Sequence, residues 1–521
     1  MKKKKNSNRK IFIILFILIT IIRFLLSFNL KSFYISNLSY DDNLMVNQML
    51  SLVSGNYLGE YSDVTLIKGI IFPLFLTLCR LMHTNYSLIL TILYIGAVIY
   101  FIRPFEKIIK NKKLLFLFYI VMLFNPITYS SELFQRLYRN SLSIIELLFF
   151  LGTLIRIIDT KQIKKNIINY ILLGIISSIM YLTREDNIWI KLIFIFLIVY
   201  EYLKSKNIKN VIICLIPFIV LTINLNIVSF INYKYYKIYT YNEIQKSEFK
   251  NTYKKVLQIK DDEKKDKVSI PRTTFFKLTS YIETFNITRR EINQYYKVLI
   301  DDTGEIYNGN IIWYFRQFVY RKNNFKDGKE SEEYYKKMGQ EIDIKFKDRT
   351  FGKELAFSSI LLNMPTPNEI IHMPINLFKI VEYTTIYKNV KTITNYDNFK
   401  YDEEVDAYRV VNLDSHTTEN IVKKNNKYYE VIRIIYMIIT VVFSPIALII
   451  YIKNIKKKDN YNLITTIILF IYLIILAGVT YTDATAFPTK RYLCLGNLYI
   501  LQTIFIMLNI IKIKNTKLLK R

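Results

Sequence analysis

Long apolar stretches recur along this chain, separated by short connections rich in Lys and Arg. We mark eleven of them, at residues 11–28, 69–83, 86–102, 114–128, 141–158, 168–183, 188–203, 211–230, 431–451, 462–480 and 493–511. A helix needs about 20 predominantly apolar residues to cross a bilayer. The pattern therefore predicts a mainly α-helical, polytopic membrane protein with ten or eleven apolar helices.

The basic connections predict which helix ends face the cytoplasm, because Lys and Arg are enriched in cytoplasmic loops. They gather before the first stretch and at 103–113, 161–165, 204–209, 452–458 and beyond 512. Placing all of these, with both termini, on the cytoplasmic side of the cell membrane requires an even number of crossings. We therefore expect 69–83, which is short and contains Pro73 and Arg80, to form a half-inserted or interfacial helix. The alternative is that it spans and that 103–113 departs from the rule.

Residues 231–430 form a different kind of sequence, polar and rich in Tyr, without an apolar run long enough to span. We expect a soluble extracytoplasmic domain here, between a catalytic membrane module at 1–230 and the last membrane helices at 431–521. A segment of this length can bury a core of its own. Within it, the sequence predicts helices at 285–299 and 330–342.

Composition narrows the class of protein. The chain has 521 residues, 52% of them hydrophobic, and a formal net charge of +30. In a soluble protein this charge would suggest nucleic acid as a partner, but here most Lys clusters lie between apolar stretches, where they set orientation. The cysteines and histidines show no disulfide framework and no metal-ligand spacing; they are Cys79, Cys214, Cys494, His83, His372 and His416.

The connection after the first apolar stretch, residues 29–68, holds an acidic pair, Asp41 and Asp42. With the N-terminus in the cytoplasm, this loop lies on the outer face of the membrane. A carboxylate pair at the boundary of water and lipid can supply a general base, because desolvation and a like-charged neighbour both shift its proton affinity. The alternative is a solvated loop that contains two acids.

This acidic pair, followed by Lys68 and Pro73 at the start of the next apolar stretch, resembles the GT-C superfamily of membrane glycosyltransferases. That superfamily includes the protein O-mannosyltransferases and the aminoarabinose transferases of lipid A. Asp42 stands where the family usually has Glu, and Pro73 stands near its usual Pro-Pro. The resemblance covers the N-terminal half and the pattern of spans. It implies inverting transfer of a sugar from a polyprenyl-phosphate donor, with Asp41 as general base and Asp42 tuning or positioning it. Members of the family differ in whether a divalent metal takes part.

Further charged residues gather in the other short connections that this topology places outside. A departing phosphate needs fixed cations or donors close to the membrane surface. The candidate substrate-binding residues are Lys68, Arg136, Arg139, Arg184, Glu185, Lys490 and Arg491. The alternative is that these charges neutralise one another as ion pairs. The aromatic run at 309–318 is either a sugar-stacking surface or a hydrophobic core helix.

Three functions compete. A transferase accounts for the clustered outer charges; its acceptor would be a glycan, a lipid or a protein. A lipid or polysaccharide flippase or transporter would show internal repeats and paired charges at mid-membrane depth, but Arg23, Arg80 and Glu146, which lie inside apolar runs, show no repeat. A membrane-anchored scaffold with an outer binding domain explains 231–430 but leaves the clustered charges without a role.

Overall fold

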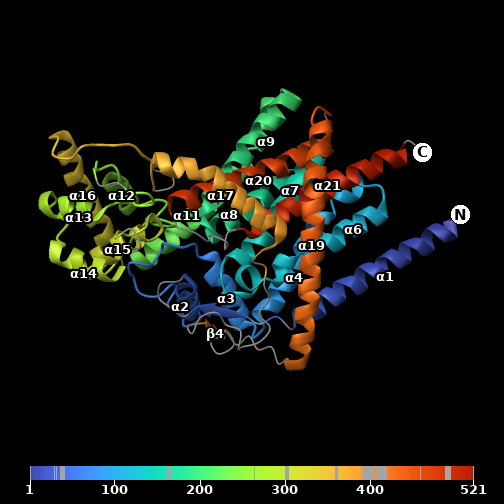
Figure 1. The fold of residues 1–521 in the computed structure, drawn as a ribbon, viewed down its shortest axis with the longest axis horizontal. Coiled ribbons are helices and arrows are strands. Elements are labelled where there is room, and N and C mark those ends of the chain that lie inside the picture. The colour runs from blue at the N-terminus through green and yellow to red at the C-terminus, as the bar shows by residue number, and fades with distance from the viewer. Residues whose placement is uncertain are drawn as a thin grey trace.

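Helices dominate the structure, a computed structural model that describes residues 2–28, 30, 32–35, 41–160, 166–262, 265–299, 304–357, 362–388, 390, 404–406, 419–457, 459–486 and 495–519 (Figure 1). The mainly α-helical prediction is therefore confirmed. Strands in the described residues form two short antiparallel pairs. β1 (Phe33–Ile35) pairs with β4 (Glu404–Asp406), and β2 (Ala356–Phe357) pairs with β3 (Leu362–Asn363).

Within the described ranges, seven helical segments are long and apolar enough to cross a membrane: Tyr86–Ile108, Lys112–Tyr129, Asn140–Asp159, Ile208–Tyr236, Lys427–Asn454, Asn460–Thr485 and Gly496–Ile513. This supports a multi-pass membrane protein. The number is below the ten predicted crossings, because other apolar stretches form shorter helices, such as α8 with 17 residues and α9 with 16. α3 (Ile71–Leu81) has 11 residues. It is about 17 Å long, too short for a hydrocarbon core of about 30 Å, as expected for a helix that does not span.

The apolar helices pack as one bundle, in the order α1 (Lys2–Ser27), α2 (Asp41–Val53), α3, α4 (Tyr86–Ile102), α5 (Phe105–Ile108), α6 (Lys112–Leu123), α7 (Asn140–Asp159), α8 (Ile167–Thr183), α9 (Ile190–Ser205), α10 (Ile208–Ile213), α11 (Ile216–Tyr236), α17 (Pro367–Ile386), α19 (Glu419–Asn454), α20 (Asn460–Thr485) and α21 (Gly496–Leu519). α7 is almost wholly buried, and α4, α8 and α21 pack against it. Gly152 permits the approach of α4, since a Cβ there would lie 2.8 Å from the ring of Tyr100. The centre of the bundle is thus set by α7.

A second hydrophobic core lies in a lobe beside the bundle. The lobe contains α12 (Glu248–Leu257), α13 (Arg272–Tyr281), α14 (Arg289–Leu299), α15 (Asn308–Asn323) and α16 (Gly328–Lys347). α16 covers the helix predicted at 330–342, and α14 forms the part of the predicted helix 285–299 that begins at Arg289. The aromatic run at 309–318 lies in α15, where Phe315 and Phe318 are buried in the core of the lobe. That part of the run is a core helix, one of the two interpretations of the sequence.

The lobe does not follow the predicted range of 231–430. Tyr57 and Leu66, from the segment after α2, pack in the core of the lobe. α17 lies inside the predicted range, but its Ile380, and Tyr387 directly after it, join the core of the bundle. α17 has apolar residues at helical spacing along one face. They are too few to predict a membrane span, but they are enough to pack α17 against α20 and α19.

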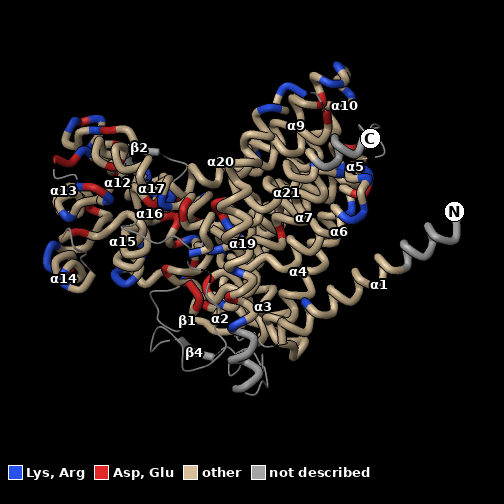
Figure 2. The backbone as a smooth tube through the Cα atoms, turned by 45° about the vertical axis from the view of Figure 1, so that its right-hand side comes forward, with Lys and Arg blue, Asp and Glu red and all other residues tan. Residues whose placement is uncertain are grey.

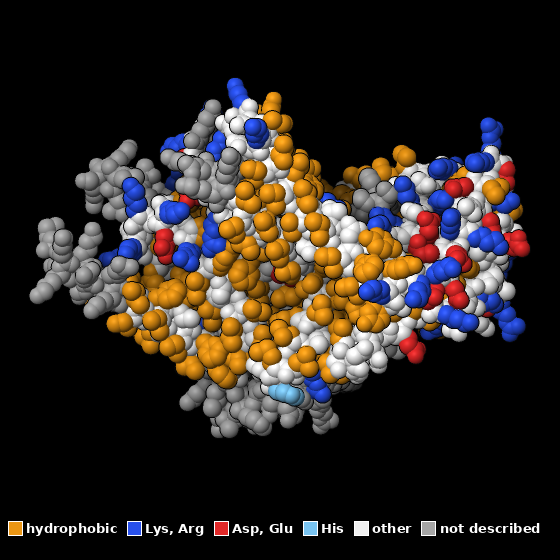
Figure 3. Space-filling model, turned by 180° about the vertical axis from the view of Figure 1, so that it is seen from behind, with side chains coloured by type: hydrophobic (Ala, Val, Ile, Leu, Met, Phe, Trp, Pro, Cys, Tyr) orange, Lys and Arg blue, Asp and Glu red, His pale blue; other side chains and the backbone are white. Residues whose placement is uncertain are grey.

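The bundle and the lobe also differ in the charged and hydrophobic residues on their surfaces. Lys and Arg gather near α5 and α10 at one end of the bundle, and a second group, mixed with Asp and Glu, lies around α2 and α3 (Figure 2). We call this second end the Asp41 end. Figure 3 shows a broad hydrophobic surface over the bundle and mixed charges over the lobe. Such a large apolar surface is unfavourable in water and suits contact with lipid.

Candidate active site

Charged side chains from four segments meet at the Asp41 end of the bundle. They come from the start of α2, from the residues before α3, from the connection between η2 (Ser131–Gln135) and α7, and from the connection between α8 and η4 (Glu185–Trp189). We call this group the charge cluster; its members are Asp41, Asp42, Lys68, Arg136, Arg139, Arg184 and Glu185. All were predicted from the sequence. The predicted Lys490 and Arg491 lie outside the described residues.

Asp41 is the acid of the pair that reaches solvent, with 28% of its side chain exposed. Its Oδ2 lies 2.9 Å from Lys68 Nζ and 3.6 Å from Arg139 Nη2, and accepts a 2.8 Å hydrogen bond from Tyr138 Oη. Burial raises the pKa of Asp41, but Lys68 and Arg139 outweigh it and hold that pKa below its ordinary value. The first turn of α2 also favours a carboxylate, because a helix N-terminus carries partial positive charge. Asp41 is therefore ionised at neutral pH.

Asp42 is fully buried and belongs to the framework. Its Oδ1 and Oδ2 accept hydrogen bonds of 2.7 and 2.6 Å from Arg136, and Oδ2 also accepts one of 3.1 Å from the backbone N–H of Ile35. Burial raises the pKa of Asp42, and the guanidinium of Arg136 opposes this rise. With both oxygens engaged and no exposed surface, Asp42 holds β1 and Arg136 in place.

Arg139 joins two acids from distant segments. Besides Asp41, it contacts Glu185, with Nη1 2.6 Å from Oε2. Glu185 Oε1 also accepts a 3.0 Å hydrogen bond from the backbone N–H of Gly69. Only glycine fits at that position, because a Cβ there would lie 1.7 Å from the carbonyl oxygen of Leu182. This close approach holds Lys68 beside Asp41.

Arg184 lies at the edge of the cluster. Its Nε and Nη2 donate to the two carboxylate oxygens of Asp186 at 2.9 and 2.6 Å, and Nη1 bonds the side chain of Asn140. The side chain of Asp186 is 59% exposed. In this structure Arg184 is thus an ion-paired residue whose partner can move into solvent.

Three residues of the site were missed or misjudged from the sequence. Tyr138 donates to Asp41; its position between Arg136 and Arg139 is the signal that could have revealed it. Trp313 places its ring centroid 4.5 Å from Lys68 Nζ. The aromatic run that contains it was noted, but its link to Lys68 was not. Asn242 donates to Glu185 at 3.4 Å and gave no signal at all.

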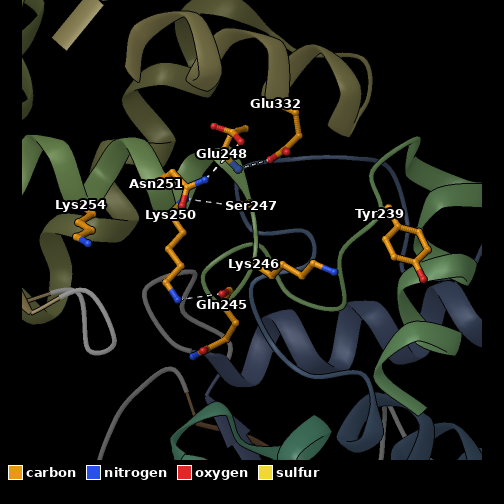
Figure 4. Close-up of a pocket in the computed structure, with 9 residues that line it drawn as sticks. All are labelled: Tyr239, Gln245, Lys246, Ser247, Glu248, Lys250, Asn251, Lys254 and Glu332. Carbon is orange, nitrogen blue, oxygen red and sulfur yellow. Dashed lines mark hydrogen bonds between the residues drawn. The ribbon is translucent and has the colours of Figure 1, made fainter. Parts of the chain in front are cut away.

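A separate cleft of about 480 Å³ opens on the lobe (Figure 4). Lys246 extends over it with Nζ 5.2 Å from the ring centroid of Tyr239, and Lys250 donates a 3.0 Å hydrogen bond to the backbone oxygen of Gln245. Glu332 accepts a 2.8 Å hydrogen bond from the first N–H of α12. Because that carboxylate is engaged at a helix terminus, the cleft offers a weaker case for chemistry than the charge cluster does.

No group of three or more His, Cys, Asp or Glu side chains that could hold a metal ion is found in the described part of the chain. These residues thus give no defined set of metal ligands. No protein-family model, curated protein or solved structure matches this chain. The functional conclusion therefore depends on the geometry of the charge cluster.

Proposed function

We propose that this protein is an inverting glycosyltransferase of GT-C type that acts on the outer face of the cell membrane. It would transfer a sugar from a polyprenyl-phosphate donor to a hydroxyl of a glycan, lipid or protein. The observation that carries the proposal is the contrast between the two neighbouring acids. Asp41 is ionised and reaches solvent, whereas Asp42 is fully buried on Arg136. This is the arrangement of one reacting base beside one positioning residue.

In the proposed step, Asp41 accepts the proton of the acceptor hydroxyl as its oxygen attacks the anomeric carbon. The bond between that carbon and the phosphate oxygen breaks, and the polyprenyl phosphate leaves with the electron pair. Lys68 and Arg139 lie within reach of Asp41 and would also attract the donor phosphate. When Lys68 and Arg139 pair with the donor phosphate, they stabilise the ionised form of Asp41 less. The pKa of Asp41 then rises. Donor binding would thereby turn a weak base into a stronger one.

The cations of the cluster have carboxylate partners, so a donor phosphate must exchange with an acid. Arg184 is the position at which this exchange costs least, because Asp186 is largely exposed and regains water when it leaves. Trp313, beside Lys68, supplies an aromatic face near the same point. Sugar rings pack well on such faces, so Trp313 is the candidate for sugar contact.

The direct test incubates the purified protein with a panel of polyprenyl-phosphate sugars and acceptors, and measures released polyprenyl phosphate. Release that depends on Asp41 is expected. Movement of the lipid-linked sugar across a vesicle without its cleavage would instead support a flippase. Topology gives a second test: reporter fusions after Lys113 and Lys209 should report cytoplasm, and a fusion near Lys260 should report the exterior. A cytoplasmic signal at Lys260 would contradict the proposed placement of the site.

A further inference from the structure

Arg23 is a fully buried cation near the end of α1, with no exposed surface. It lies four residues before Ser27, the last residue of α1, which is about 6 Å along the helix axis. β1 and Asp42 follow soon after, so Arg23 lies toward the Asp41 end of the bundle. This is the depth at which the polar headgroups of lipids are expected.

The guanidinium of Arg23 is poorly satisfied. Its Nε donates a long hydrogen bond of 3.3 Å to the backbone oxygen of Leu123, and its Cζ lies 4.6 Å from the ring centroid of Tyr129. Nη1 and Nη2 are buried without a hydrogen-bond partner among the described residues, and so is the hydroxyl of Tyr129. Two side chains in contact thus leave three buried polar atoms unpaired.

Unpaired polar atoms in a protein interior are rare, and a buried charge without a counterion is strongly unfavourable. A phosphate group would satisfy all three atoms, because it accepts two parallel hydrogen bonds from a guanidinium and has a further oxygen for a hydroxyl. Leu123 ends α6, so its carbonyl offers only the partial negative charge of a helix terminus. Among the described residues, no carboxylate forms an ion pair with Arg23.

The surroundings of Arg23 indicate that the ligand carries apolar tails. At the same level, α1 exposes Ile21, Ile22 and Leu25. α1 approaches α19 near this point (Figure 1), where Tyr429 donates a 2.6 Å hydrogen bond to the backbone oxygen of Leu26. α19 also exposes an apolar face, at Val431, Ile434, Ile435 and Ile438. The exposed apolar side chains of these two neighbouring helices offer lipid tails a surface beside Arg23.

We propose that Arg23 and Tyr129 bind the phosphate group of a membrane lipid whose tails lie along α1 and α19. The guanidinium lies over the ring of Tyr129, which also contacts the ring of Tyr429 with centroids 4.5 Å apart, so the lipid enters when Tyr129 moves from its place. The source of the phosphate is either an isoprenoid monoester or a glycerophospholipid diester. The site does not require Asp41 to be a base, so it stands or fails independently of the proposed transferase.

The test titrates the full-length protein in neutral detergent with farnesyl phosphate and, separately, with short-chain phosphatidylglycerol; farnesol is the control for the tail. Binding of either phosphate lipid, with a rise in unfolding temperature and no response to farnesol, is expected. The lipid that binds identifies the source. Arg23→Met should weaken binding about 10- to 100-fold, the size expected for hydrogen bonds to a charged group, while the lipid-free variant unfolds at the same or a higher temperature.

Tyr129→Phe keeps the proposal testable if Arg23→Met does not fold. It removes one unpaired hydroxyl and should weaken binding several-fold without loss of stability. Its matched control is Tyr119→Phe, because Tyr119 also faces α1 but its hydroxyl is paired at 2.7 Å with Thr20. That control should lose stability and keep its lipid affinity. Wild-type affinity in Arg23→Met and Tyr129→Phe, or binding of neither phosphate lipid, would overturn the proposal.

Discussion

The charge cluster and the Arg23 site bury arginine at the same end of the bundle but balance its charge in opposite ways. In the cluster, Arg136 donates two hydrogen bonds to Asp42, and Arg139 contacts Glu185 at 2.6 Å. At Arg23, two guanidinium nitrogens have no partner in the described chain. Removal of an acid from the cluster takes a close counterion from a buried cation, whereas removal of Arg23 takes away a buried charge that has no counterion among the described residues.

This difference separates two kinds of binding. A balanced cluster is stable without a ligand, and an incoming phosphate can enter only by displacing a carboxylate. That exchange changes the proton affinity of the displaced acid, which is useful for catalysis. An unbalanced cation gains its counterion from the ligand, so binding itself stabilises the fold. This contrast supports the two proposals made above, chemistry at the cluster and binding of a lipid phosphate at Arg23.

The largest expected effect is on turnover in Asp41→Asn. The substitution keeps the size and much of the hydrogen bonding of the side chain but removes the proton acceptor, so transfer should fall about 10²- to 10⁴-fold. Lipid binding at Arg23 should be unchanged, which would separate the two regions. Asp343→Asn is the control, since it removes an equal charge from an exposed position on the lobe, away from the charge cluster. Near-normal transfer by Asp41→Asn would place the base elsewhere, with Glu185 the next candidate.

Asp42→Asn should act on stability. It removes the buried carboxylate that accepts two hydrogen bonds from Arg136 and leaves the longer 3.5 Å contact with the partly exposed Glu132. Loss of one partner of a buried pair costs about 3–5 kcal/mol, and Glu132 should reduce this cost. Thermal unfolding in detergent measures this loss. The double variant Asp42→Leu, Arg136→Met should recover most of it, because both charges are gone. A single Asp42→Asn variant as stable as Arg23→Met would contradict the distinction between balanced and unbalanced sites.

Arg184 tests whether a balanced cation can also serve as a ligand. If Arg184 only neutralises Asp186, the double variant Arg184→Ala, Asp186→Ala should regain full donor affinity. If it holds the donor phosphate, affinity should stay about tenfold lower whatever replaces the acid, and Arg184→Lys should recover only part, because an ammonium lacks the planar fork. The measurement is the affinity for a polyprenyl-phosphate sugar. Full recovery in the double variant would leave Arg136 and Arg139 as the phosphate ligands.

The smallest effect concerns pH and extends the comparison to the lobe. Burial raises the pKa of Glu332 to about 7, against about 4.3 in an unfolded chain. Between these values the unfolded chain has lost a proton that the folded lobe retains, so the free energy of unfolding should fall as pH rises, by about 1 kcal/mol after solvent screening.

Asp41 has the opposite sign. Because its folded pKa is lowered, its contribution to stability is present above about pH 4 and is lost as pH falls through the folded pKa. Unfolding temperatures measured from pH 5 to 7 should therefore show a slope that Glu332→Gln abolishes and Asp41→Asn retains. A slope that persists in Glu332→Gln would assign it to another group.

Much of the fold could be predicted from the pattern of apolar and basic residues along the chain. Apolar runs between basic connections are enough to indicate a helical, multi-pass protein, since burial in lipid and helix length depend on neighbouring residues in sequence. The shortness of 69–83 likewise indicated a helix that does not span. The boundary of the lobe could not be predicted in this way. Tyr57 precedes the predicted range but packs in the core of the lobe, and α17 lies inside that range but packs in the core of the bundle. Such packing depends on which surfaces meet in the fold.

The sequence by itself also determined which charged residues merit attention, but not how they are paired. Asp42 and Arg136 are 94 positions apart, and Arg139 and Glu185 are 46 apart. Their pairing arises only when the start of α2, the connection before α7 and the connection after α8 come together in the fold. In sequence, Arg23 is simply a cation inside an apolar run. Only the tertiary structure shows it buried with no counterion in the part of the chain that is described. Electrostatic balance depends on distances across the fold, whereas hydrophobic periodicity depends on the order of residues along the chain.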